Sequence, residues 1–133
     1  MKLLPIFALL STVWVVSASP ASHPNFANAL IIDKAAVTCN CSGNVLSNGD
    51  IANALNRAQT LGGGDYPHTY NNLEGFTFPD CTKPFQEYPV FQGATYTGGK
   101  PGPDRVIYQT NGGQFCGCIT HTNEGGNTFV KCT

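Results

Sequence analysis

Charged side chains are scarce in this sequence, and neither sign dominates. Its 133 residues include 7 Lys and Arg and 8 Asp and Glu, which together make up 11% of the chain. A protein that follows a long phosphate backbone usually carries a large positive charge. The composition therefore excludes that class and limits any contact with nucleic acid to a few nucleotides in a cleft. Internal repeats and heptads are also lacking, which excludes solenoids and coiled coils.

Long hydrophobic runs are absent except at the N-terminus. Lys2 is followed there by the apolar segment 3–16 and by small residues up to Ala18. This order is typical of a secretory signal peptide, and the run is too short for a membrane-spanning helix. We expect a signal peptide over residues 1–18, with cleavage after Ala18 or as late as Ala21, and a secreted product without a membrane anchor. Loss of Lys2 leaves a formal charge of 6 − 8 = −2.

The rest of the chain is rich in glycine, proline and cysteine, with 15, 9 and 6 residues. This suits one small, loop-rich domain, which we place at residues 35–133, with further N-terminal trimming before Ala35. An even number of cysteines in a secreted chain predicts three disulfides, and the pairing stays open at this point. The cysteines are Cys39, Cys41, Cys81, Cys116, Cys118 and Cys132.

Zinc is the alternative use of the two Cys-x-Cys pairs, together with His121. Side chains alternate along a strand, so a strand over residues 115–121 would place Cys116 and Cys118 on one face and His121 on the other. This geometry disfavours a zinc site.

One helix is predicted at about residues 48–61. Ser47 is a typical N-cap, Asp50 lies in the first turn, and Gly62-Gly63-Gly64 ends the pattern. An apolar stripe at positions i, i+4 and i+7 is formed by Ile51, Leu55 and Ala58.

Several short segments have the alternating pattern of strands. They are an edge strand within 36–41, and the segments 85–91, 105–108 and 115–121, separated by turn signals at 97–104 and 111–113. In the second segment Phe85 and Glu87 share one face, and Pro89 limits the ladder. The sequence therefore predicts an α+β fold, with one amphipathic helix packed on a twisted antiparallel sheet in a small, disulfide-stapled single domain.

The stretch 66–76 contains two tyrosines, a histidine, two asparagines and a glutamate. A carboxylate such as that of Glu74 can accept the adjacent N1–H and N2–H donors of guanine, whereas adenine has an acceptor at N1. A neighbouring aromatic ring can stack on the base. The alternative interpretation is a polar, Asn-rich turn between two strands.

Ionisable side chains stand on three separate predicted strands, at Glu87, Arg105 and His121. With the right register they would converge on the sheet face opposite the helix, joined by His68. An acid–base pair beside a cation suits phosphoryl transfer from an RNA 2′-hydroxyl without metal. The alternatives are a surface pair for Glu87 and Arg105, and a satisfied strand-end histidine for His121.

These motifs together resemble the secreted fungal guanyl-specific ribonucleases of the T1/N1 family, which have the microbial ribonuclease fold. The matching segments lie in family order between Cys39 and Cys132. They are 66–76, 87–90, 96–99, 101–106, 119–122 and 126–132.

The resemblance implies a role for each catalytic residue. Glu87 would be the general base, His121 the general acid and Arg105 the phosphate-stabilising cation. His68 would support or replace the base, and the rings flanking the phosphate would be Tyr66 and Phe129. The family uses no metal and no cofactor, and it forms a 2′,3′-cyclic phosphate that is then hydrolysed to the 3′-phosphate.

The resemblance also implies a guanine pocket, in which Glu74 reads the base, Tyr70 stacks on it and backbone groups complete the site. The remaining pocket residues are Asn71, Asn72, Leu73 and Asn127. We expect a monomer that acts on single-stranded RNA and not on DNA. Leu73 replaces the tyrosine that closes over the base in the best-known relative, so weaker guanine binding with the preference kept is expected.

Further departures occur at Thr69, at Asn123 and in the larger cysteine set. By analogy Cys132 would pair with one of the N-terminal cysteines, for which we take Cys41. For the other four cysteines, which allow three pairings, our hypothesis is Cys39–Cys118 and Cys81–Cys116. Two alternative functions stay open: a ribotoxin-like cytotoxic ribonuclease, and a catalytically silent secreted binding protein on the same scaffold.

Overall fold

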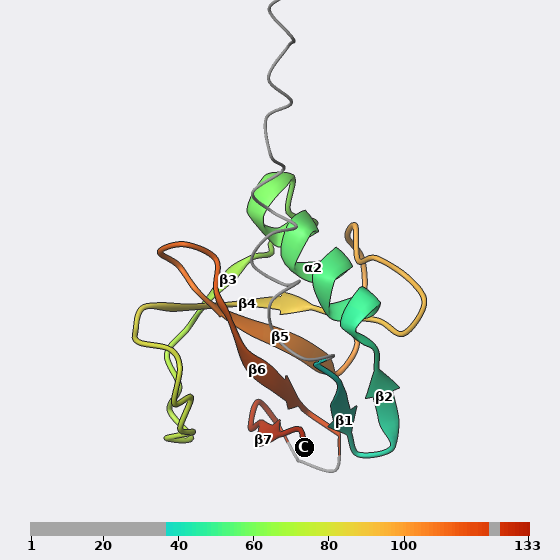
Figure 1. Ribbon diagram of the computed structural model, residues 1–133. Coiled ribbons are helices and arrows are strands. Elements are labelled where there is room, and N and C mark those ends of the chain that lie inside the picture. Colours follow the sequence, from blue (N-terminus) through green and yellow to red (C-terminus); the bar gives the residue numbers. More distant parts are fainter. Residues whose placement is uncertain (1–36, 123–125) are drawn as a thin grey trace, which may run out of the picture.

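A computed structural model describes residues 37–122 and 126–133 (Figure 1). The expected signal peptide at 1–18 and Asn123 lie outside these residues. In the described part of the chain, no helix is long and apolar enough to cross a membrane.

Five antiparallel strands form the main sheet, in the order β3-β4-β5-β6-β7. Their bounds are His68–Tyr70, Phe85–Pro89, Asp104–Gln109, Phe115–Thr120 and Val130–Lys131. A separate two-stranded sheet consists of β1 (Cys39–Cys41) and β2 (Asn44–Leu46). The helix α2 (Asn48–Thr60) packs on β4 and β5 of the main sheet (Figure 1). The predicted α+β fold is confirmed.

The N-terminus of α2 is closed by a capping box. Ser47 Oγ accepts the N–H of Asp50 at 3.2 Å, and Asp50 Oδ2 accepts the N–H of Ser47 at 2.8 Å. Although burial opposes ionisation, hydrogen bonds from Ser47 and Gly93 lower the pKa of Asp50. The predicted apolar stripe is confirmed, because Ile51, Leu55 and Ala58 are buried against the sheet.

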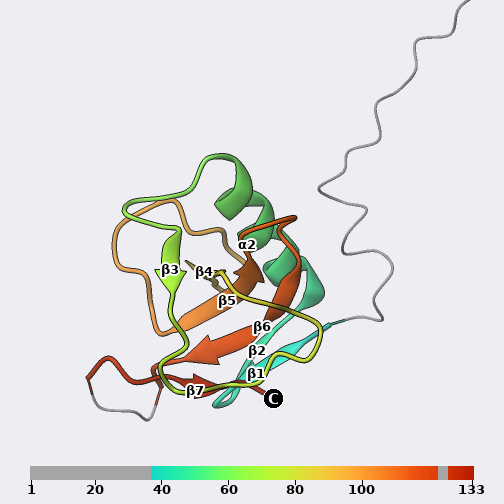
Figure 2. The ribbon, with the colours of Figure 1, turned by 90° about the vertical axis from the view of Figure 1, so that its left-hand side faces the viewer.

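Two apolar clusters lie on opposite faces of the main sheet. The helix-side cluster contains Tyr88 and Val106, and the opposite cluster contains Phe85 and Ile107. Neighbours along β4 and β5 fall into different clusters because strand side chains alternate. Figure 2 shows the segment after β3 running down to β7, where Lys131 Nζ donates to the carbonyl of Thr77 at 2.7 Å.

The expectation that Cys116 and Cys118 share a face is wrong. Ile107 pairs with Gly117 and Tyr108 with Phe115, so Cys116 is an extra residue that bulges out of the ladder. A bulge shifts the alternation by one residue. Cys118 therefore lies in the helix-side cluster, whereas Cys116 packs on the opposite one.

The structure contains the disulfides Cys39–Cys118, Cys41–Cys132 and Cys81–Cys116, which is the pairing hypothesised from the sequence. No thiol is free, so the cysteines have none to offer as zinc ligands.

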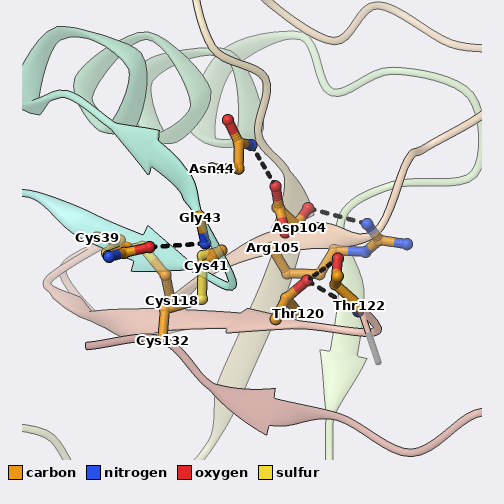
Figure 3. Close-up of a disulfide and its surroundings, with 11 residues drawn as sticks. Cys39, Cys41, Gly43, Asn44, Asp104, Arg105, Cys118, Thr120, Thr122 and Cys132 are labelled. Atoms are coloured by element: carbon orange, nitrogen blue, oxygen red, sulfur yellow. Dashed lines mark hydrogen bonds between the residues drawn. A yellow bond between two sulfur atoms is a disulfide. The ribbon is translucent and has the colours of Figure 1, made fainter. Parts of the chain in front are cut away.

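Two of these disulfides fix the β1–β2 hairpin to β6 and to the C-terminus (Figure 3). A hydrogen bond of 2.6 Å from Asn44 Nδ2 to the buried Asp104 Oδ2 links the same hairpin to the start of β5.

Element ends differ from the predictions by one to three residues. The helix ends at Thr60, with Leu61 as its C-cap, and β4 ends at Pro89 rather than at Phe91. β6 ends one residue before His121, and β1 begins only at Cys39. The short strands β2, β3 and β7 were not predicted.

Candidate active site

The face of the main sheet opposite α2 carries the predicted ionisable residues. Arg105 pairs with Pro89 across the β4–β5 ladder, and Glu87 pairs with Ile107 two residues further on, so both side chains leave the sheet on one face. Glu87 is 8% exposed and Arg105 is 3% exposed. The alternative of a surface pair is therefore wrong.

His68 lies on β3 directly across from Glu87. Its Nδ1 atom is 3.6 Å from Glu87 Oε1, and its ring stacks on that of Tyr66 with centroids 3.9 Å apart. The His68 side chain is 45% exposed, against 10% for Glu87. The histidine therefore covers the carboxylate from the solvent side.

Glu87 has the electrostatics of a poised base. Burial raises its pKa, and the positive charges of Arg105, His68 and His121 offset part of this effect. Its Oε2 atom is buried without a hydrogen-bond partner. A carboxylate with a raised pKa and a free oxygen is suited to accept a proton from a bound hydroxyl.

Arg105 is held by the loop that precedes it. Its Nη1 donates to three backbone carbonyls at 2.8 to 3.2 Å, and its Nη2 donates to Tyr66 Oη at 3.1 Å. The carbonyls belong to Pro101, Gly102 and Asp104. Arg105 Nε is buried without a partner. The guanidinium is thus fixed in place and keeps its Nε–H for an anion.

His121 follows the end of β6, and its N–H donates to the carbonyl of Pro103 at 3.0 Å. Its Nδ1 lies 2.8 Å from the carbonyl oxygen of Thr128. A carbonyl only accepts hydrogen bonds, so Nδ1 carries a hydrogen and Nε2 is left for chemistry. Phe129 supports the imidazole, with ring centroids 3.7 Å apart at 30°.

The carboxylate of Glu74 is occupied by two donors of the protein itself. Its Oε2 accepts the hydroxyl of Tyr70 at 3.0 Å, and its Oε1 accepts the N–H of Phe129 at 3.2 Å. Burial and the nearby Glu74 raise the pKa of Tyr70 far above its ordinary value, so the phenol remains a donor. Tyr70 is 6% exposed as a whole residue, and its ring meets Phe129 edge-on, which leaves little free face for stacking in this conformation.

The stretch 66–76 also contains the Asn-based turn that was the alternative interpretation. Asn72 has a φ of 54° and exchanges hydrogen bonds of 2.7 and 2.8 Å with the backbone of Phe76. Leu73 at the tip is 90% exposed, and Asn71 and Asn127 are exposed too. Glu74 itself is half-buried.

Sequence reasoning missed the backbone groups that hold the ionisable side chains. The carbonyls of Pro101, Gly102 and Thr128 fix Arg105 and His121. Every residue has such a carbonyl, so no signal in the sequence distinguishes these three.

Comparison with known proteins gives the family. The ribonuclease family matches residues 34–133. The guanyl-specific ribonuclease U1 of Ustilago sphaerogena is 48% identical over 101 residues, covering 73% of this chain and 96% of that protein. The guanyl-specific ribonuclease N1 of Neurospora crassa is 36% identical over 148 positions, covering 94% and 95%.

A solved structure, the ribonuclease He1 from Hericium erinaceus, superposes with a TM-score of 0.61 at 45% identity. It covers 73% of this chain and 99% of its own. The match of the whole domain in sequence and in fold shows that the chain belongs to the ribonuclease family, in its fungal T1/N1 branch.

Proposed function

We propose that this protein is a secreted, monomeric endoribonuclease that cleaves single-stranded RNA on the 3′ side of guanosine. The observation that carries the proposal is the convergence on one sheet face of Glu87, whose Oε2 has no hydrogen-bond partner, and Arg105, whose Nε has none. These two atoms offer a proton acceptor and a hydrogen-bond donor for an anion on the same face of the sheet.

The first step is a transesterification. Glu87 removes the proton of the 2′-hydroxyl, and the oxygen attacks the adjacent phosphorus. His121 donates its Nε2 proton to the departing 5′-oxygen, so the products are a 2′,3′-cyclic phosphate and a free 5′-hydroxyl. DNA lacks the attacking hydroxyl and is not a substrate.

The second step hydrolyses the cyclic phosphate with the roles exchanged. Neutral His121 takes a proton from water, the water oxygen attacks phosphorus, and protonated Glu87 returns its proton to the 2′-oxygen. The product is a 3′-phosphate, and both side chains regain their starting states.

The cation and the rings serve both steps. Arg105 stabilises the charge that develops on the phosphoryl oxygens, and its fixed guanidinium needs no reorganisation. Tyr66 and Phe129 flank the phosphate, and His68 supports the base from 3.6 Å away.

Base selection is assigned to Glu74. Guanine would present N1–H and N2–H to the carboxylate in place of the Tyr70 hydroxyl and the Phe129 N–H, whereas adenine places an acceptor there. The backbone of Asn71, Asn72 and Asn127 would complete the pocket. Stacking by Tyr70 requires its ring to leave the buried position that it has in this structure.

Digestion of an oligoribonucleotide with a single guanosine, in EDTA, tests the proposal. We expect one cut, after guanosine, and a cyclic phosphate that later opens, as identified by mass. No cleavage by the folded, disulfide-intact protein would favour the silent-binder alternative, and cleavage after every base would remove Glu74 from base selection. On purified ribosomes, a single discrete fragment would instead favour the ribotoxin alternative.

A further inference from the structure

One peptide group joins the base-selection carboxylate to the proposed acid. The carbonyl of the Thr128–Phe129 peptide accepts from His121 Nδ1 at 2.8 Å, and the N–H of the same peptide donates to Glu74 Oε1 at 3.2 Å. Resonance across a peptide bond couples its oxygen to its nitrogen. The carboxylate and the imidazole are therefore the two ends of one hydrogen-bonded chain.

Such a chain is cooperative. A carboxylate that accepts the peptide N–H draws electron density toward the carbonyl oxygen, which becomes a stronger acceptor for the Nδ1–H of His121. The gain is larger for the protonated imidazole than for the neutral one, because a charged donor makes the stronger bond. Glu74 thus strengthens the hydrogen bond that holds the His121 ring with Nε2 free.

Ring contacts connect the same residues by a second route. Phe129 stacks on His121 at 3.7 Å and meets the Tyr70 ring edge-on at 6.0 Å, and the Tyr70 hydroxyl donates to Glu74 Oε2 at 3.0 Å. A displacement of the Glu74 carboxylate would therefore disturb both the hydrogen bonds and the packing that orient the imidazole.

We propose that Glu74 is a positioning residue for His121, acting through the Thr128–Phe129 peptide, in addition to its part in base selection. This inference rests on the proposed function for the roles of the two side chains. Guanine that binds Glu74 would compete for the charge that polarises the peptide. The strength of the hydrogen bond to His121 would then depend on whether guanine is bound.

Other charges act on His121 as well. Glu87 on β4 interacts with it electrostatically, and Arg105 on β5 and His68 on β3 surround the same carboxylate. None of them contacts the Thr128–Phe129 peptide through a hydrogen bond in the described part of the chain. A change at Glu74 leaves these three groups in place, so it isolates the proposed connection.

The test is an NMR titration of His121 in the ligand-free protein, comparing Glu74→Gln with the unchanged protein. Glutamine keeps the shape and an oxygen for the Phe129 N–H but loses the charge. We expect the measured pKa of His121 to fall by about 0.3, the size of a 10–30% weakening of one charge-assisted hydrogen bond. In the unchanged protein the chemical shift of the Phe129 amide should change with pH along the His121 titration. In the variant this change should be smaller.

Asp65→Asn is the matched control, because it removes the same charge from an exposed side chain. We expect no change in the pKa of His121 there. A direct attraction between the two charges across solvent would be screened in 1 M salt, whereas the hydrogen-bonded chain would not. An unchanged pKa in Glu74→Gln, or a fall that disappears in 1 M salt, would overturn the inference.

No RNA is used in this titration, so its outcome does not depend on the reaction. A normal coupling in a protein that fails to cleave RNA would reject the proposed function and leave the coupling in place. Cleavage after guanosine by a protein in which Glu74→Gln leaves the His121 titration unchanged would reject the coupling alone.

Discussion

Replacement of Glu87 by alanine tests which group removes the 2′-hydroxyl proton. General bases typically contribute a factor of about 10² to 10⁴ in rate. His68 lies 3.6 Å from Glu87 Oε1 and is stacked on Tyr66, so it is in place to accept the proton when the carboxylate is missing. We therefore expect the loss in kcat/KM to stay near the lower end, at about 10²-fold.

The assay is single-turnover cleavage of a guanylyl dinucleotide as a function of pH. His68→Ala alone should cost less than Glu87→Ala, and the double variant should lose more than either because no substitute base remains. The lower limb of the pH profile of Glu87→Ala should move toward that of an imidazole. Nearly full activity of Glu87→Ala would refute the assignment of Glu87 as the main base.

Three further predictions concern single side chains. Burial raises the pKa of Glu87, so the folded state binds its proton more tightly than the unfolded state, and this contribution to stability is lost as pH rises above the ordinary value of 4.5. Glu87→Gln should therefore raise the thermal midpoint at about pH 7 and leave it nearly unchanged at about pH 3; an equal rise at both would contradict this origin. Leu73→Tyr should lower KM for guanylyl substrates by about 5- to 150-fold, as expected for about 1 to 3 kcal/mol of stacking, with little change for adenylyl substrates. Ser47→Ala should cost about 1 kcal/mol in urea unfolding by removing the cap of α2, and an unchanged midpoint would mean that the cap contributes nothing.

The helix was predictable because its signals are local. Ser47 and Asp50 lie three residues apart and form the capping box by themselves, and Gly62, with a φ of 61°, ends the segment where a left-handed residue is needed. None of these contacts depends on the rest of the fold. Hence the sequence placed the helix to within one residue.

The short strands were not predictable for the opposite reason. β3 and β7 contain three and two residues, too few for an alternating pattern to be visible. They exist because β4 and β6 offer unpaired edges beside them. The bulge at Cys116 is also invisible in the sequence, since it depends on how β5 and β6 are aligned.

The sequence named the candidate site residues, but it could not establish that they converge. Alternation along β4 indicates that Glu87 shares a face with Phe85, and the structure agrees. The register that sets Arg105 across from Pro89 depends on the loop between β4 and β5, whose path no local rule gives. Before the structure, only the resemblance to a family implied that these side chains act together in one site.

The loop before β5 shows why a turn signal can conceal a catalytic requirement. Its proline and glycine residues indicate only a turn, yet the carbonyls of Pro101 and Gly102 hold Arg105 Nη1. Gly102 has a φ of 62°, and a Cβ there would lie 2.8 Å from the Phe91 ring, so a larger residue would strain the backbone and push against that ring. The fixed prolines restrict the remaining freedom of the same carbonyls. The rigidity that orients the guanidinium is therefore encoded in residues without ionisable side chains. The Thr128 carbonyl orients the His121 ring in the same way.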